Sequence, residues 1–143
     1  MGGALQVLTL DEIVEINRRM ILRFGGIFFE ADANLANRGS LEHVLVQIQF
    51  PLFGQQRFPT ALEKAAAICW RIITDHVFHD GNKRTGMEAC RLFLELNGYS
   101  LTIDREVVSI ALKIATGEIV FKEFVQWLKS RTSEGEQPQE TVT

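Results

Sequence analysis

Residues 76–86 read His76-Val77-Phe78-His79-Asp80-Gly81-Asn82-Lys83-Arg84-Thr85-Gly86. Apolar residues at helical spacing precede this stretch, at Ala65, Ile68, Cys69, Ile72 and Ile73, and a second set follows it, at Ala89, Cys90, Leu92, Phe93 and Leu96. The two patterns predict two buried helices. Their junction holds two histidines, a carboxylate, an amide and two cations, which is more polar chemistry than a turn requires. The functional site is therefore expected at this junction.

The composition limits the class of protein. A chain of 143 residues with 46% hydrophobic residues suits one domain with a real core. No apolar run approaches the roughly 18 residues of a membrane span, and no signal peptide is evident, so a cytoplasmic protein without a membrane partner is expected. The formal net charge of -3 argues against a bulk nucleic-acid binder. Cys69 and Cys90 lie on apolar helix faces and are expected to be buried free thiols.

The helical patterns predict an all-α bundle of about six helices. The expected helices span residues 10–24, 41–49, 61–75, 82–97, 105–116 and 120–131. Their predicted N-caps include Thr9, Ser40, Thr60 and Asp104, with capping boxes at the first and third. The helix at 61–75 is apolar on most sides, so it belongs in the middle of the bundle. Residues 99–103 are expected to be a short extended link, 1–131 the domain, and 132–143 a disordered polar tail.

Residues 50–59 interrupt the helical pattern. Two prolines and a glycine forbid a continuous helix, and three phenylalanines are more than a solvated loop needs. One interpretation is a loop pinned to the core by its aromatic side chains. The other is a short hairpin or flap before the central helix, whose free edge receives an extended peptide by strand addition. The docking residues of such a flap would be Phe50, Leu52, Phe53 and Arg57.

The polar junction has the geometry of an anion site. It leads into a helix N-terminus, where unpaired amides and the helix dipole favour an anion. Gly81 allows the backbone to approach a ligand closely. Lys83 and Arg84 fall in the first helical turn, where each cation costs about 0.3–1 kcal/mol. A phosphate bound between them would explain this cost, so the two cations are the main physical argument for a polyphosphate site.

The side chains of the junction suit phosphoryl or nucleotidyl transfer. An unperturbed imidazole titrates at about pH 6.5, so His76 can accept the proton of a hydroxyl. Asp80 is a hard oxygen ligand, suited to an Mg²⁺ ion that bridges phosphates and keeps most of its waters. Asn82 either orients a phosphate oxygen or ties the loop to itself. Phe78 is expected to anchor the loop in the core, and His79 to be exposed and turned away from His76.

At these residues the sequence resembles the Fic/Doc family, whose motif runs His-x-Phe-x-Asp/Glu-Gly-Asn-Gly/Lys-Arg. Seven positions match in order, namely His76, Phe78, Asp80, Gly81, Asn82, Lys83 and Arg84. Further similarity to the Doc (death-on-curing) branch lies in residues 23–26, 37–42, 84–98 and 115–118, so the resemblance covers roughly residues 7–130. Many AMP-transferring Fic enzymes have Gly in place of Lys83 and a second Arg in place of Met87, and Doc shares both departures.

The resemblance implies a reaction and roles for the matching residues. His76 would deprotonate the target hydroxyl, Asp80 would bind Mg²⁺, and phosphate would be held by Gly81, Asn82, Lys83 and Arg84, the last also a catalytic residue. A Doc-like enzyme would transfer the γ-phosphate of ATP to a Ser or Thr of a cellular protein, elongation factor Tu for Doc-like enzymes. A separate antitoxin chain would inhibit it. AMP transfer, as in many Fic enzymes, is the close alternative.

Other interpretations belong to different classes. A metal-dependent hydrolase would use His76, His79, Asp80 and Glu88, although the two histidines lack the i, i+4 spacing of a helical metal site. A non-catalytic binding module would keep the fold without the reaction. Thr132-Ser133-Glu134-Gly135-Glu136 also matches the Ser/Thr-x-x-x-Glu core of the family's self-inhibitory helix, a match that a polar tail gives by chance.

Overall fold

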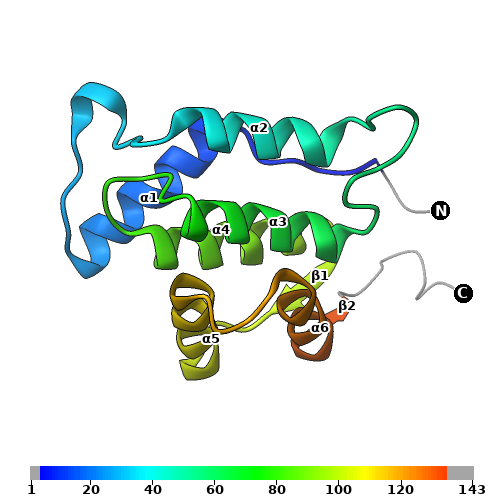
Figure 1. Cartoon of the computed structure of the whole chain (residues 1–143). Coiled ribbons are helices and arrows are strands. Elements are labelled where there is room, and N and C mark those ends of the chain that lie inside the picture. The colour runs from blue at the N-terminus through cyan, green and yellow to red at the C-terminus, as the bar shows by residue number, and fades with distance from the viewer. Residues whose placement is uncertain (1–3, 135–143) are drawn as a thin grey trace, which may run out of the picture.

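In the computed structural model, which describes residues 4–134, the chain is a helical bundle with one small sheet (Figure 1). The elements are α1 (Leu10–Phe24), the 3-10 helix η1 (Glu30–Asp32), α2 (Arg38–Gln49), α3 (Ala61–Thr74), α4 (Asn82–Leu96), β1 (Tyr99–Leu101), α5 (Arg105–Thr116), α6 (Phe121–Arg131) and β2 (Thr132–Glu134). The six α-helices confirm the predicted all-α class. None of the helices in the described range is long and apolar enough to cross a membrane.

Most helix starts follow from local capping chemistry. The Thr9 hydroxyl accepts the amide of Glu12, and the Glu12 carboxylate accepts the amide of Thr9, as predicted. Thr60 and Glu63 form the same capping box at the start of α3. Asp104 accepts two amides of the first turn of α5. Each of these side chains satisfies backbone donors that a helix start leaves unpaired.

The predicted start of α2 was wrong. Asn37, and not Ser40, is the N-cap: its Oδ1 accepts the Ser40 amide at 3.3 Å, so the helix begins at Arg38. Asparagine caps a helix as well as serine does, and it stands three residues earlier. The Ser40 hydroxyl instead donates to Asp75 Oδ2 at 2.6 Å, which ties α2 to the end of α3.

Helix α3 lies in the middle of the bundle, as its apolar surface predicted, and contacts α2, α4, α5 and α6 (Figure 1). Its closest neighbour is α4. A Cβ atom at Gly86 would lie 3.2 Å from the carbonyl oxygen of Cys69, so the backbones of the two helices approach each other closely there. Cys69 and Cys90 are buried free thiols, as expected. The tight α3–α4 pair fixes the two ends of the loop that joins them.

A two-stranded sheet closes the C-terminal part of the described chain. β1 and β2 are antiparallel, with Tyr99 opposite Glu134. The extended link at 99–103 was predicted, but its partner Thr132–Glu134 begins the segment that was expected to be a disordered tail. Residues 135–143 of that tail lie outside the described residues. The self-inhibitory match therefore begins in a strand and not in a helix, and its Glu136 is outside the described range.

Candidate active site

The loop between α3 and α4 is held by the segment that precedes α2. The Val77 carbonyl oxygen accepts the amides of Ala36 and Asn37, at 2.8 and 3.0 Å. Phe78 is 1% exposed and anchors the loop in the core, as predicted. His76 has a φ of +50°, a left-handed conformation that is uncommon for residues other than glycine. The loop backbone therefore turns sharply at the proposed base.

Asn82 closes the loop on itself. Its Oδ1 accepts the Phe78 amide and its Nδ2 donates to the Phe78 carbonyl oxygen, both at 2.8 Å. Of the two roles predicted for this amide, the structure shows the tie within the loop. Within residues 4–134 the second N–H of the Asn82 amide has no acceptor, so it can donate to a ligand.

A buried pair of asparagines, which the sequence alone does not assign to the site, supports the loop from α1 and from the segment after η1. Asn17 and Asn34 have no exposed surface, and Asn34 Nδ2 donates to Asn17 Oδ1 at 2.9 Å. Asn17 Nδ2 donates to the Asp80 carbonyl oxygen and to Thr85 Oγ1, each at 2.9 Å. The Asn34 carbonyl oxygen accepts the His79 amide at 3.0 Å. The signal in the sequence was an asparagine on the apolar face of a helix, where a buried amide needs partners.

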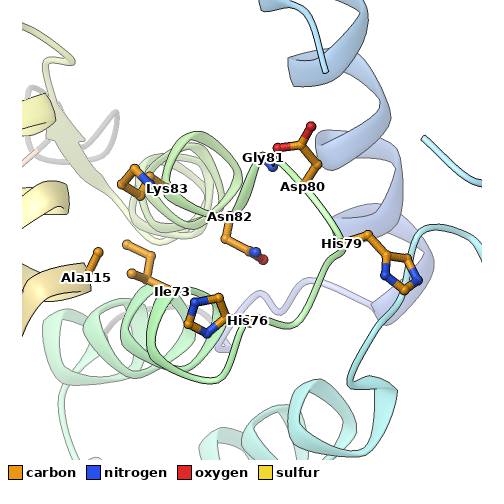
Figure 2. A pocket seen from close by; sticks show the side chains of 8 residues that line it. All are labelled: Ile73, His76, His79, Asp80, Gly81, Asn82, Lys83 and Ala115. Atoms are coloured by element: carbon orange, nitrogen blue, oxygen red, sulfur yellow. Dashed lines mark hydrogen bonds between the residues drawn. The ribbon is translucent and has the colours of Figure 1, made fainter. Parts of the chain in front are cut away.

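The first turn of α4 opens beside a cavity of about 220 Å³ (Figure 2). Gly81 is the N-cap, with a φ of +79°, and it offers no side chain to the helix start. Within the described part of the chain, the amides of residues 82–84 have no hydrogen-bond acceptor. The cavity is lined by Ile73, His76, His79, Asp80, Gly81, Asn82, Lys83 and Ala115. An imidazole, a lysine and an unpaired helix start thus border one space.

The two cations of the first turn point to different surroundings. Lys83 and His76 both line the cavity and lie on the same side of the loop (Figure 2). The guanidinium carbon of Arg84 lies 4.6 Å from the ring centroid of Phe24, at the end of α1. Arg84 is not among the residues that line the cavity. A role for Arg84 in phosphate binding therefore requires its exposed side chain to leave the Phe24 ring.

Asp80 is held by two backbone amides. Its Oδ2 accepts the Ile27 amide and its Oδ1 accepts the Gly81 amide, both at 2.9 Å. A Cβ atom at Gly26 would lie 2.7 Å from Asp80 Oδ2, so this approach requires glycine. Each carboxylate oxygen keeps acceptor capacity for a metal. Within residues 4–134 no three His, Cys, Asp or Glu side chains converge. One carboxylate completed by phosphates and water suits Mg²⁺, whereas Zn²⁺ needs several protein ligands.

The residues of the hydrolase interpretation do not come together. His79 Nε2 lies 2.8 Å from Asp32 Oδ2, and the ring is turned away from His76 (Figure 2). The hydrogen bond with His79 lowers the pKa of Asp32. Glu88 is paired with Arg91 at 2.8 Å. His79 is exposed and directed away from His76, as the sequence predicted.

Residues 50–58, which we call the flap, form a tight turn with exposed apolar side chains. The backbones of Leu52 and Gln55 exchange two hydrogen bonds, of 2.8 and 2.9 Å. Phe50 is 60% exposed, Leu52 66% and Phe53 95%. Of the three phenylalanines, Phe58 alone packs against the core, so the interpretation of a loop pinned by its aromatic side chains holds for that residue only. The short hairpin that the sequence left as one of two interpretations is the better description.

The base of the flap is held by a buried lysine. Lys64 Nζ donates to the Phe58 carbonyl oxygen and to Gln56 Oε1, the second at 3.2 Å. Burial lowers the pKa of Lys64. This anchor fixes the chain on both sides of Arg57.

Comparison with known proteins agrees with the motif in the loop. The Fic/DOC family profile matches residues 7–94. "Toxin Doc" of Mycolicibacterium smegmatis (strain ATCC 700084 / mc(2)155) is 32% identical over 92 residues, which are 64% of this chain and 71% of the relative. "Protein kinase doc" of Escherichia phage P1 is 26% identical over 112 residues, which are 78% of this chain and 84% of the relative. The chain therefore belongs to the Fic/DOC family, and within it to the Doc branch.

Proposed function

We propose that this chain is a Doc-type toxin that transfers the γ-phosphoryl group of ATP to a Ser or Thr hydroxyl of a cellular protein. The observation that carries the proposal is the cavity shared by His76 and Lys83 at a helix start whose first amides are unpaired. Membership of the family supports it, and so does the name of one relative, a protein kinase.

His76 is the general base of the proposed reaction. It accepts the proton of the target hydroxyl while that oxygen attacks the γ-phosphorus. The bond from the γ-phosphorus to the oxygen that bridges it to the β-phosphate breaks, and ADP leaves. Within residues 4–134 the His76 ring has no hydrogen-bond partner, so its nitrogens are available to the substrate. Lys83 and the unpaired amides of α4 stabilise the charge on the phosphoryl oxygens.

Asp80 is the proposed ligand for Mg²⁺, and Mg²⁺ would neutralise phosphate charge when bound. The amides of Ile27 and Gly81 fix the Asp80 carboxylate, and Asn17 fixes its carbonyl oxygen. Gly81 and Asn82 border the phosphates, with Asn82 also closing the loop. Arg84 joins them by leaving its contact with Phe24.

The proposed partners are a protein substrate and an antitoxin. Phe50, Leu52, Phe53 and Arg57 form the docking flap, because the exposed edge at the Leu52–Gln55 turn can receive an extended peptide. Elongation factor Tu is the first target to test. A separate antitoxin chain is the proposed inhibitor, and the name "Toxin Doc" of one relative supports this partner.

The test follows each phosphorus of ATP separately. The protein is incubated with Mg²⁺, purified elongation factor Tu or a bacterial lysate, and ATP labelled at either the α or the γ position. The proposal expects protein-bound label from γ-labelled ATP and none from α-labelled ATP, with loss of the label for His76→Ala. Label from the α position alone would assign AMP transfer instead. Unchanged growth inhibition by His76→Ala in cells would favour a non-catalytic module.

A further inference from the structure

A second hollow lies on α3, on the side of the flap. It has a volume of about 360 Å³ and is lined by Arg57, Phe58, Ala67, Trp70, Arg71, Thr74, Asp75 and Phe121. We call it the α3 groove. Four of these residues, Ala67, Trp70, Arg71 and Thr74, follow the i, i+3, i+4, i+7 spacing of one helix face. At 1.5 Å per residue this stripe is about 10 Å long. The lining residues thus follow α3 from the flap base toward the loop that carries His76.

Packed aromatic rings give the groove a fixed shape. The Phe121 ring lies 5.6 Å from the Trp70 ring and 5.7 Å from the Phe58 ring, between centroids. Phe58 is held in turn by the hydrogen bond from Lys64 to its carbonyl oxygen. A ligand therefore finds the apolar surface already formed, and binding costs little ordering of side chains.

The charged side chains that line the groove carry a net positive charge. Two arginines, Arg57 and Arg71, face one carboxylate, that of Asp75. Arg71 is engaged, because it donates to Gln47 Oε1 at 3.0 Å and lies 3.7 Å from Asp75 Oδ2. Arg57 has no acidic partner within residues 4–134, and its guanidinium carbon lies 5.7 Å from the Phe58 ring centroid. Arg57 is thus a cation without a counter-charge beside an aromatic surface.

The groove ends next to the proposed base. Asp75 lines the groove and directly precedes His76, which lines the catalytic cavity. Consecutive Cα atoms are about 3.8 Å apart, so the last residue of the groove lining and the proposed base are neighbours at the end of α3. An extended peptide advances about 3.3 Å per residue, so a chain along the 10 Å stripe brings a hydroxyl to His76 about three residues beyond the flap base.

We propose that the α3 groove is a specificity subsite for an acidic side chain of the protein substrate. The carboxylate of a Glu or Asp pairs with Arg57, whose planar guanidinium suits bidentate binding of a carboxylate. The aliphatic part of that side chain packs on Trp70 and Phe58. The proposal rests on the proposed function for its occupant, a segment of the target that lies within a few residues of the acceptor hydroxyl.

A binding experiment tests the subsite without any catalysis. The ¹⁵N-labelled protein, free of ATP, is titrated with blocked heptapeptides of Ala and Gly around a central Ser, each with one Glu at a different position. The same set with Gln is the matched control. At least one Glu peptide is expected to shift the indole N–H resonance of Trp70 at roughly tenfold lower concentration than its Gln counterpart, as one charge-assisted pair predicts.

Variants connect that preference to one residue. Arg57→Gln is expected to abolish the difference between Glu and Gln peptides, and Arg57→Glu to transfer the preference to a matching Lys peptide. Arg105→Glu, a charge reversal at the start of α5 and outside the groove, is expected to behave as wild type. Equal response to Glu and Gln peptides, or no response at Trp70, overturns the subsite. A wild-type preference for Lys peptides also overturns it, because it assigns the groove to a basic side chain at Asp75.

The two proposals can fail separately. Selective binding of a Glu peptide by a protein that transfers no γ-label to any target would retain the subsite and overturn the proposed kinase reaction. Transfer of γ-label to a target by a protein that binds Glu and Gln peptides equally would retain the kinase and overturn the subsite. Each readout uses a different ligand, so neither result depends on the other.

Discussion

The side-chain amide of Asn17 in α1 donates a hydrogen bond of 2.9 Å to the backbone carbonyl oxygen of Asp80, 63 residues later in the chain. The same nitrogen donates to Thr85 Oγ1, and Asn34 donates to the Asn17 Oδ1. Asn17, Asn34 and Thr85 have no exposed surface. The proposed metal ligand is therefore positioned by a buried polar network, in which a missing partner is more costly than at the surface.

Removal of Asn17 should affect both stability and activity. Asn17→Ala leaves the Thr85 hydroxyl, the Asn34 amide and the Asp80 carbonyl oxygen without their partner, and each buried unpaired group costs about 1–3 kcal/mol. A loss of at least about 3 kcal/mol in the free energy of unfolding is expected, together with a loss of phosphoryl transfer. Thr85→Val, which removes one of these bonds, should cost about 1–2 kcal/mol. Urea titrations measure both, and equal losses for the two variants would contradict the network.

The cavity side chains should affect the reaction more than the fold. His76→Ala is expected to lower kcat by about 10²–10⁴-fold, because the base is lost. Lys83→Gln is expected to lower kcat/KM for ATP by about 10²-fold, because a fixed charge on the phosphates is lost. Rates of γ-label transfer measure both. His43→Ala, an exposed histidine on α2, is the matched control and should keep the wild-type rate. Comparable loss in all three variants would contradict these roles.

The packing of α3 against α4 gives a prediction on stability. A Cβ atom at Gly86 would lie 3.1 Å from Ile73 Cγ1 and 3.2 Å from the Cys69 carbonyl oxygen, so Gly86→Ala should destabilise the fold by about 1–3 kcal/mol. At Gly39, in the first turn of α2, a Cβ atom would meet nothing within 4 Å. Gly39→Ala should therefore stabilise by about 0.5–1 kcal/mol, since alanine loses less backbone entropy on folding. Opposite shifts in the urea midpoint are expected, and a stabilising Gly86→Ala would contradict the close crossing.

The sequence was sufficient to predict structural features that depend on residues close to one another in the chain. Apolar spacing and the boxes at Thr9 and Thr60 predicted the helices, and the motif in residues 76–84 predicted the site. Side chains whose partners lie far along the chain were not predictable in this way. The sequence alone does not assign Asn17 to the site, because its partners Asp80 and Asn34 come from two later loops. Strand β2 was read as tail, because its pairing with β1 has no periodic signal in three residues.

The direction in which a long side chain points was the second feature that the sequence did not predict. Lys83 and Arg84 are adjacent in the first turn of α4, and the sequence assigned both to phosphate. Successive residues on a helix point about 100° apart, and the neighbour on each side decides what the side chain contacts. Lys83 lies at the cavity, whereas Arg84 lies over Phe24, a residue on α1 that the sequence does not place there. Only the packing of α1 on α4 reveals this difference.

The buried thiols should be unreactive in the folded protein. Burial raises the pKa of Cys90 to about 12 and that of Cys69 well above its ordinary value. The thiolate is the reactive form, so at about pH 8 neither residue should react with a disulfide reagent such as DTNB on the time scale of an exposed thiol. Two thiols should react in concentrated urea. Rapid release of two equivalents of thionitrobenzoate, one for each thiol, on addition of DTNB to the native protein would contradict the position of α3 against α4.

The N-cap of α5 should make the stability of the protein depend on pH in the acidic range. Asp104 Oδ2 accepts a hydrogen bond from Arg131 at 2.6 Å, and this bond lowers the pKa of Asp104. A carboxyl whose pKa is lower in the folded state than in the unfolded state stabilises the protein at pH values above its unfolded pKa, which is about 3.8–3.9. This contribution is lost as the pH falls through the pKa of the folded state. Asp104→Asn keeps an oxygen for the cap but loses the charge.

The difference in Tm between wild type and Asp104→Asn should therefore be largest at neutral pH and shrink below about pH 4. Salt at about 1 M should reduce the difference at neutral pH, because it screens the exposed pair. A difference that is the same at pH values above and below the titration would show that the charge on Asp104 does not provide the stabilisation.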